Sequence, residues 1–204
     1  GRYQNLLTRS EALDHADWVK TNVAAITADG VTAPNGTATA EALSPATAAT
    51  TTVKNTSGTA AAASTAYTFA VWGKVPSSTK SVVLTVGDSA TNATSTVTFT
   101  TTWQRVSVSY TASGTPSGNV FGQVGDATWT AGTIHLWGAQ LEPAAAPGVY
   151  VRTTPAAVAA GQGAVTDGVP TGTGSGTGTV TSVSVTTANG VSGSVATATT
   201  TPAI

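Results

Sequence analysis

The chain has 204 residues, among them 42 threonines, 36 alanines and 22 glycines, but only 8 Lys and Arg and 9 Asp and Glu, for a net charge of −1. This balance offers no basic surface for nucleic acid or an anionic membrane, and no apolar stretch approaches the roughly 20 residues of a spanning helix. Zero cysteines exclude disulfide scaffolds, thiolate zinc sites and cysteine nucleophiles. We therefore expect no nucleic-acid partner and no membrane insertion.

The first segment with a clear local preference is Ser10 to Val19. Ser10 is a suitable N-cap and acidic residues follow it, so the segment predicts a helix of one or two turns. His15 lies in this segment between Asp14 and Ala16-Asp17. Adjacent positions do not face each other on a helix, which favours a solvent-exposed turn over a metal site.

Further along the chain, apolar residues recur with a period of two, which is typical of strands with one buried face. Turns rich in Gly, Pro, Asp and Ser separate these runs. Seven runs are placed, at 37–43, 67–72, 82–86, 94–100, 106–110, 119–124 and 132–141. We expect eight or more strands in all, and short strands at this spacing predict an all-β antiparallel sandwich.

The composition changes near residue 152. All 12 aromatic residues lie between Tyr3 and Tyr150, and a single charged side chain, Asp167, lies beyond Arg152. About 150 residues with five tryptophans are sufficient for one hydrophobic core. Residues 1–152 are therefore predicted to form one globular domain.

The remainder of the chain has two parts. Residues 153–178 are rich in Gly, Pro and Ala and are predicted to be a flexible linker. Residues 179–204 regain β-branched side chains around an Asn189-Gly190 turn, which predicts a short β segment. A lone hairpin is marginal in water, so we expect this segment to be ordered only within an oligomer.

Several motifs follow one another in a recognisable order. They are Asn5-Leu-Leu with Ser10-Glu11 and Trp18, Ala33–Thr37, Tyr67–Lys74, Thr102–Val106, and the closing Leu136–Glu142 with Tyr150–Thr153. In this order they resemble the jelly-roll, carbohydrate-binding-module-like domain of tailed-bacteriophage tail-fibre and tail-spike proteins. The tail, with Gly178–Val185 and Thr199–Pro202, is similar to a recurrent phage fibre linker.

This resemblance implies a non-enzymatic structural protein of the virion, in a tail fibre or related external appendage, that contributes to attachment to a host-surface glycan. It also implies a homotrimer in contact with other tail or capsid proteins. Two alternatives stay open: a carbohydrate-binding accessory module of a phage glycan depolymerase, and a purely architectural fibre or capsid-decoration domain. With two His, six Asp and three Glu, the chain has few residues that could serve as catalytic acids or bases, and no cofactor is expected.

The candidate carbohydrate-binding residues are Trp129, Trp137 and His135. Trp129 is flanked by turn-forming residues and is the tryptophan expected on a loop, where binding residues concentrate. His135 and Trp137 share one face of a strand, where they would form a patch that stacks on sugar rings. Burial in the core is the competing interpretation, because tryptophan is highly buried on average.

The other tryptophans are expected to pack. Trp72 is out of phase with the apolar positions of its strand, so it either packs under the N-terminal segment beside Trp18, which is favoured, or is exposed in a binding surface or oligomer interface. Trp103 opens a strand and is expected to close one end of the core.

The resemblance also nominates Glu11 and Glu142 as ligands of a structural calcium, which modules of this kind often carry near the chain ends. Calcium takes six to eight oxygen ligands, and two carboxylates supply few of them. A salt bridge from Glu142 to Arg105 or Arg152 is the alternative.

Overall fold

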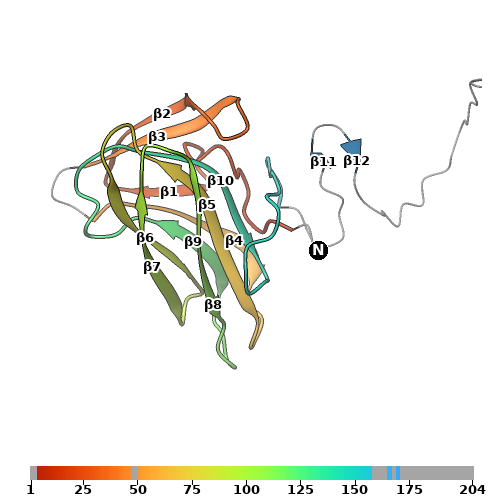
Figure 1. Cartoon of the computed structure of the whole chain (residues 1–204). Coiled ribbons are helices and arrows are strands. Elements are labelled where there is room, and N and C mark those ends of the chain that lie inside the picture. Colours follow the sequence, from red (N-terminus) through yellow and green to blue (C-terminus); the bar gives the residue numbers. More distant parts are fainter. Residues whose placement is uncertain (1–3, 47–49, 158–164, 167–168, 171–204) are drawn as a thin grey trace, which may run out of the picture. The chain divides into compact units, whose positions relative to one another are not determined.

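The structure is a computed structural model that describes residues 4–46, 50–157, 165–166 and 169–170 (Figure 1). The chain divides into two compact units, Gly1–Gly172 and Thr173–Ile204. All of the described residues belong to the first unit. The β segment predicted at 179–204, and most of the linker predicted at 153–178, lie outside the described residues.

Two five-stranded antiparallel sheets form the described part of the first unit. The first sheet has the order β1 (Trp18–Thr21), β4 (Thr52–Ala60), β9 (Asn119–Val124), β6 (Lys80–Gly87), β7 (Asn92–Phe99). The second has the order β2 (Val23–Thr32), β3 (Ala38–Pro45), β10 (Ile134–Glu142), β5 (Ala66–Lys74), β8 (Gln104–Thr111). The two short strands β11 (Val165–Thr166) and β12 (Val169–Pro170) pair separately. The predicted all-β jelly-roll sandwich is confirmed.

All seven placed runs are strands, namely β3 and β5 to β10. Three further strands, β1, β2 and β4, were not anticipated, because their sequences lack a clear apolar alternation. In β4 the positions that point inward after Val53 are Asn55 and Ser57, which are buried but polar. In β2 most side chains are exposed or small, as suits a strand at the edge of its sheet.

The predicted helix at Ser10–Val19 is wrong: among the described residues there is no helix, and so none long and apolar enough to cross a membrane. The segment is a run of tight turns, with His15 N donating to Ala12 O at 3.2 Å and Trp18 N donating to His15 O at 3.1 Å. Leu13 and Trp18 are both fully buried. In a helix, two positions that are five residues apart point to different sides, so Leu13 and Trp18 could not both face the core. The turns allow both side chains to be buried.

The main core lies between the two sheets. Its largest fully buried side chains include Trp18 of β1, Phe69 of β5 and Phe99 of β7. Glycines opposite the rings make room for them, because a Cβ at Gly122 would collide with Phe69 and one at Gly73 would collide with Phe99. The core is therefore packed by aromatic rings set against glycine backbone.

The first and last segments of the sandwich are joined. Leu6 N donates to Leu141 O at 2.7 Å, and Arg9 N donates to Thr154 O at 2.8 Å. The fully buried Asn5 side chain donates to Ala139 O and Val151 O, both at 2.9 Å. The segment after β10 is thereby held against the outer side of the second sheet, where the candidate site lies.

Candidate functional site

The outer face of the second sheet carries a row of large side chains. Trp72 of β5 lies opposite Trp137 of β10 on one side and opposite Arg105 of β8 on the other. One step along the strands, His135 lies opposite Lys74. Positions paired across strands, or two residues apart on one strand, project from the same face, so all five side chains leave the sheet on one side.

A β-bulge in β10 shapes the middle of this face. The register shifts between Trp137 and Gln140, and Gly138 at the bulge has φ +63°. A Cβ at Gly138 would lie 3.1 Å from Trp72 and 3.4 Å from the Tyr150 ring. The glycine therefore supplies both the left-handed conformation of the bulge and the space in which two aromatic rings approach the backbone.

These rings belong to a second apolar cluster, separate from the main core. Trp137, 4% exposed, packs with the buried Ala33 and Ala40. The partly buried members are Val31, Trp72, Trp103 and Tyr150. The ring centroids of Trp137 and Tyr150 are 4.8 Å apart at an interplanar angle of 50°. We call Trp72, Trp103, Trp137 and Tyr150 the aromatic patch.

The turn end of the β2–β3 hairpin covers part of the patch. β2 and β8 are opposite edges of the sheet, yet Trp103 Nε1, just before β8, donates to Thr32 O of β2 at 3.0 Å. The register of β2 shifts between Thr27 and Val31, where Asp29 has φ +52°. This irregularity lets the end of the hairpin, seen at the top of Figure 1, bend over the outer face.

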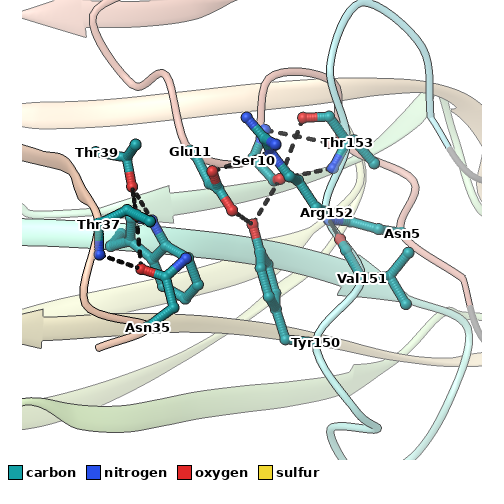
Figure 2. A network of polar contacts seen from close by, with 11 residues as sticks. Asn5, Ser10, Glu11, Asn35, Thr37, Thr39, Tyr150, Val151, Arg152 and Thr153 are labelled. Carbon is teal, nitrogen blue, oxygen red and sulfur yellow. Dashed lines mark hydrogen bonds and ion pairs between the residues drawn. The ribbon is translucent and has the colours of Figure 1, made fainter. Parts of the chain in front are cut away.

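A chain of polar groups fixes that hairpin end to the patch (Figure 2). Trp137 Nε1 donates to Thr39 Oγ1 at 3.0 Å, and Thr39 Oγ1 lies 2.8 Å from Thr37 Oγ1. Thr37 Oγ1 donates to Asn35 Oδ1 at 2.7 Å, and Thr37 N donates to the same oxygen at 3.1 Å. Hydroxyl and amide groups therefore border the aromatic rings on this side.

A second network holds Tyr150 on the other side (Figure 2). The Tyr150 hydroxyl donates to Glu11 Oε1 at 3.2 Å and lies 2.8 Å from Ser10 Oγ. Glu11 Oε2 lies 3.0 Å from Arg152 Nε. Burial raises the pKa of Glu11 although Arg152 opposes the shift, and burial with the nearby Glu11 raises the pKa of Tyr150. The tyrosine thus stays a neutral hydrogen-bond donor at physiological pH.

Residues 143–151, which we call the covering segment, close the other half of the face. They are anchored by Gln140 bonding to Val149 and Val151, Glu142 to Gly148, Thr68 to Ala144, Ser109 to Ala145 and Arg105 to Gly148. The shortest of these bonds, Arg105 Nη1 to Gly148 O, is 2.6 Å. What remains partly open is the aromatic patch with Lys74 and His135 beside it.

The open part contains polar atoms with few partners. Lys74 Nζ lies 4.9 Å from the centroid of the Trp103 ring. Trp72 Nε1 and His135 Nδ1 are buried and have no hydrogen-bond partner among the described residues. Burial, and secondarily the charge on Lys74, lowers the pKa of His135, so the imidazole is neutral at pH 7. The partly exposed rings can stack on apolar faces, and the Lys74 ammonium beside them can donate hydrogen bonds.

The predicted site residues are only partly brought together. His135 and Trp137 do share one face, but Trp137 is the buried base of the patch rather than an exposed platform. Trp129 lies on a loop as expected, but its prediction as a ligand-stacking residue is wrong. The ring is fully buried in the main core and its Nε1 donates to Gly132 O at 3.0 Å. A turn at Gly125, φ +96°, folds the loop inward over it.

Of the two alternatives for Trp72, packing beside Trp18 is wrong: Trp18 is in the main core, and Trp72 is partly exposed on the opposite side of the second sheet. The expectation for Trp103 is also wrong. Trp103 does not close the core but joins the aromatic patch. The alternation of residues in its strand did indicate that the Trp72 side chain points away from the main core. Nothing in the sequence indicated that Trp103 reaches the β2–β3 hairpin.

The carboxylates nominated for calcium do not fit a calcium site. Glu11 is bonded to Tyr150 and Arg152, while Glu142 Oε1 accepts Gly148 N at 2.8 Å and the Gln140 amide at 2.6 Å. Both Glu11 oxygens and Glu142 Oε1 thus already face protein donors. Within the described ranges no three His, Asp or Glu side chains are grouped so as to hold a metal ion.

No family model matches the sequence, and no curated protein matches it. Solved structures do match. Tailspike protein 4 of bacteriophage CBA120, in its enzymatically active domain, has a TM-score of 0.51 and 14% identity over 67% of this chain and 21% of that chain. The tandem CBM22-1–CBM22-2 domain of Paenibacillus barcinonensis Xyn10C has a TM-score of 0.51 and 13% identity over 71% and 46%.

The CBM22-1–GH10 modules of the Clostridium thermocellum xylanase Xyn10B, solved with xylohexaose, give a TM-score of 0.51 and 17% identity over 75% of this chain and 30% of that chain. The present chain thus spans less than half of each of these three proteins. At sequence identities this low, the similarity shows a shared fold and carries no information about ligand or activity. The described domain is a jelly-roll sandwich of the kind found in carbohydrate-binding modules and in a phage tailspike.

Proposed function

We propose that this domain binds a glycan through the aromatic patch. The observation that carries the proposal is the grouping of three partly exposed rings, Trp72, Trp103 and Tyr150, on one sheet face outside the main core. Aromatic rings supply rigid apolar area with a polar handle, and a few well-placed polar groups beside them fix the orientation of a ligand. Here those groups belong to the Asn35–Thr39 side and to Lys74.

The fold supports this choice of ligand class. Two of the similar structures contain carbohydrate-binding modules, one of them solved with xylohexaose, and the third is a phage tailspike domain. Because one fold hosts many functions, the similarity in fold does not by itself assign a glycan ligand. The proposal rests on the aromatic patch.

We further propose that the domain belongs to a virion appendage of a tailed phage, a tail fibre or related structure, and that it performs no chemistry itself. The motif order and the fibre-like tail sequence support this placement. A homotrimer, in contact with other tail or capsid proteins, would multiply a weak single-site affinity by avidity. Light scattering of the full chain that returns a monomeric mass at micromolar concentration would contradict the trimer.

Two alternatives remain. The domain is an accessory module of a glycan depolymerase if its parent chain also carries a catalytic domain. A purely architectural role is favoured by one observation, the burial of Trp18, Trp129 and Trp137. The architectural role predicts that the domain binds no glycan. The accessory-module role predicts that the parent protein degrades the glycan that this domain binds.

Affinity electrophoresis of the full chain through host-surface polysaccharides tests the proposal. Trp72→Ala and Trp103→Ala should each weaken retention by about tenfold or more, because one stacked ring contributes on the order of 1–2 kcal/mol. Thr96→Ala, an exposed position on the first sheet, is the control. Circular dichroism confirms that each variant is folded. Equal retention of all variants would support the architectural role.

A further inference from the structure

We propose that the glycan held by the aromatic patch is acidic, and that Lys74, beside Trp103, is the contact for its carboxylate. This inference rests on the proposed function and specifies its ligand class. It is carried by the distribution of charged groups around the open part of the outer face.

The ionisable groups of this face are unevenly distributed. In β10, β5 and β8 the outward positions place His135, Lys74, Arg105 and Glu142 there. Glu142 is 4% exposed, lies against the covering segment, and already accepts Gly148 N and the Gln140 amide. Lys74 and His135 therefore have no carboxylate beside them on these three strands, whereas the charge of Glu142 acts on Arg105.

The carboxylates of neighbouring elements are directed elsewhere. Glu11, behind Tyr150, is paired with Arg152 at 3.0 Å. Asp29, at the irregularity in β2, is exposed, and no ion pair of the described residues joins it to Lys74. None of these carboxylates is therefore paired with Lys74.

Lys74 is placed for such a contact. Its ammonium lies 4.9 Å from the centroid of the Trp103 ring, within the range of a cation–π interaction. The ion pairs of the described residues join His15 to Asp17 and Glu11 to Arg152, and neither uses Lys74. A ligand carboxylate that reaches the edge of the patch at Trp103 would meet a cation that no carboxylate of the described residues pairs with, and would form a charge-assisted hydrogen bond.

The interior of the patch has more donors than acceptors. Trp72 Nε1 and the Nε and Nη2 atoms of Arg105 are buried without partners among the described residues. Arg105 is bonded to Gly148 O of the covering segment and lies in the field of Glu142, so Lys74 is the cation that remains for a ligand at the patch.

The test uses the full chain and matched polysaccharide pairs. Polygalacturonate, alginate, hyaluronan and xanthan are each compared with their carboxyl-reduced forms by affinity electrophoresis, with xylan and cellulose derivatives as neutral probes. The protein should be retained by at least one acidic polymer, and carboxyl reduction should weaken that retention at least tenfold. Raising the salt from 50 to 500 mM should weaken it as well.

Lys74→Gln should reproduce the effect of carboxyl reduction and remove most of the salt dependence. Lys54→Gln is a matched control, because Lys54 Nζ also lies over an aromatic ring, 3.8 Å from the centroid of Phe121, on the outer side of the first sheet. Retention that is lost in Trp103→Ala but is unchanged by carboxyl reduction and by Lys74→Gln overturns the acidic ligand and leaves glycan binding intact. Absence of retention by every acidic and neutral polymer overturns both proposals.

Discussion

Glu41 projects from β3 into the sandwich and not toward solvent. It lies opposite Leu136, and its neighbour in phase, Leu43, is in the main core. The side chain is 1% exposed and its Oε2 is buried without a partner among the described residues. Burial, with Asp14 and Asp29 nearby, raises the pKa of Glu41 to about 8. At neutral pH this carboxyl therefore keeps its proton in the folded protein.

This residue predicts a specific pH dependence of stability. The unfolded chain releases the proton near pH 4.5 and the folded chain near pH 8, so the stabilisation present below pH 4.5 is lost as the pH rises through 8. Glu41→Gln cannot titrate and should be the more stable protein at pH 9, by up to a few kcal/mol, with a smaller advantage at pH 5. Urea unfolding at both pH values measures the difference. Parallel pH profiles for the two proteins would refute the assignment.

At the scale of elements, the β2–β3 hairpin decides the shape of the candidate site. Its end is fixed by two indole donors, Trp137 Nε1 to Thr39 Oγ1 and Trp103 Nε1 to Thr32 O, both at 3.0 Å. Its apolar residues Val31 and Ala33 cover the patch. The hairpin thus sets how much of Trp72 and Trp103 a ligand can reach.

Thr39→Val tests this role, because valine keeps the shape and removes the acceptor. The buried indole N–H would lose its partner, at a cost of about 1–3 kcal/mol. We expect faster amide hydrogen exchange in residues 31–40 and an altered affinity for any glycan that the patch binds. Thr94→Val, on an exposed strand of the first sheet, should change neither. Unchanged exchange in residues 31–40 would show that the Trp103 bond to Thr32 and apolar packing hold the hairpin end without Thr39.

The elements also show how far sequence reasoning reached. Period-two runs located β3 and β5 to β10, because the inward positions of those strands are apolar. The pattern failed in β4, whose inward Asn55 and Ser57 are polar, and sequence reasoning also failed at Ser10–Val19, where turns replace the expected helix although Leu13 and Trp18 are buried. The phase of Trp72 predicted an outward direction but not its neighbours Trp103 and Tyr150. Those neighbours depend on the bend of a hairpin and on the path of the covering segment.

At the scale of the whole domain, one side chain joins the beginning of the sandwich to its end. Asn5 donates to Ala139 O and Val151 O and accepts Leu141 N at 3.1 Å and Leu7 N at 3.2 Å. All four partners are backbone groups, two of them in β10. The side chain therefore satisfies groups that β10 cannot pair within the sheet at its bulge and end.

Asn5→Ala should destabilise the domain by about 2–4 kcal/mol, since buried backbone groups lose their partners and a small cavity forms. Because Val151 belongs to the covering segment, the same change should also loosen the closed half of the site. Thermal unfolding measures the first effect, and hydrogen exchange of residues 143–151 measures the second. Asn5→Asp, which keeps the acceptor but loses the amide donors, should retain the bonds from Leu7 and Leu141 yet still release Val151. If Asn5→Ala unfolds like the unmodified chain, the ends of the sandwich are held by their backbone pairing alone.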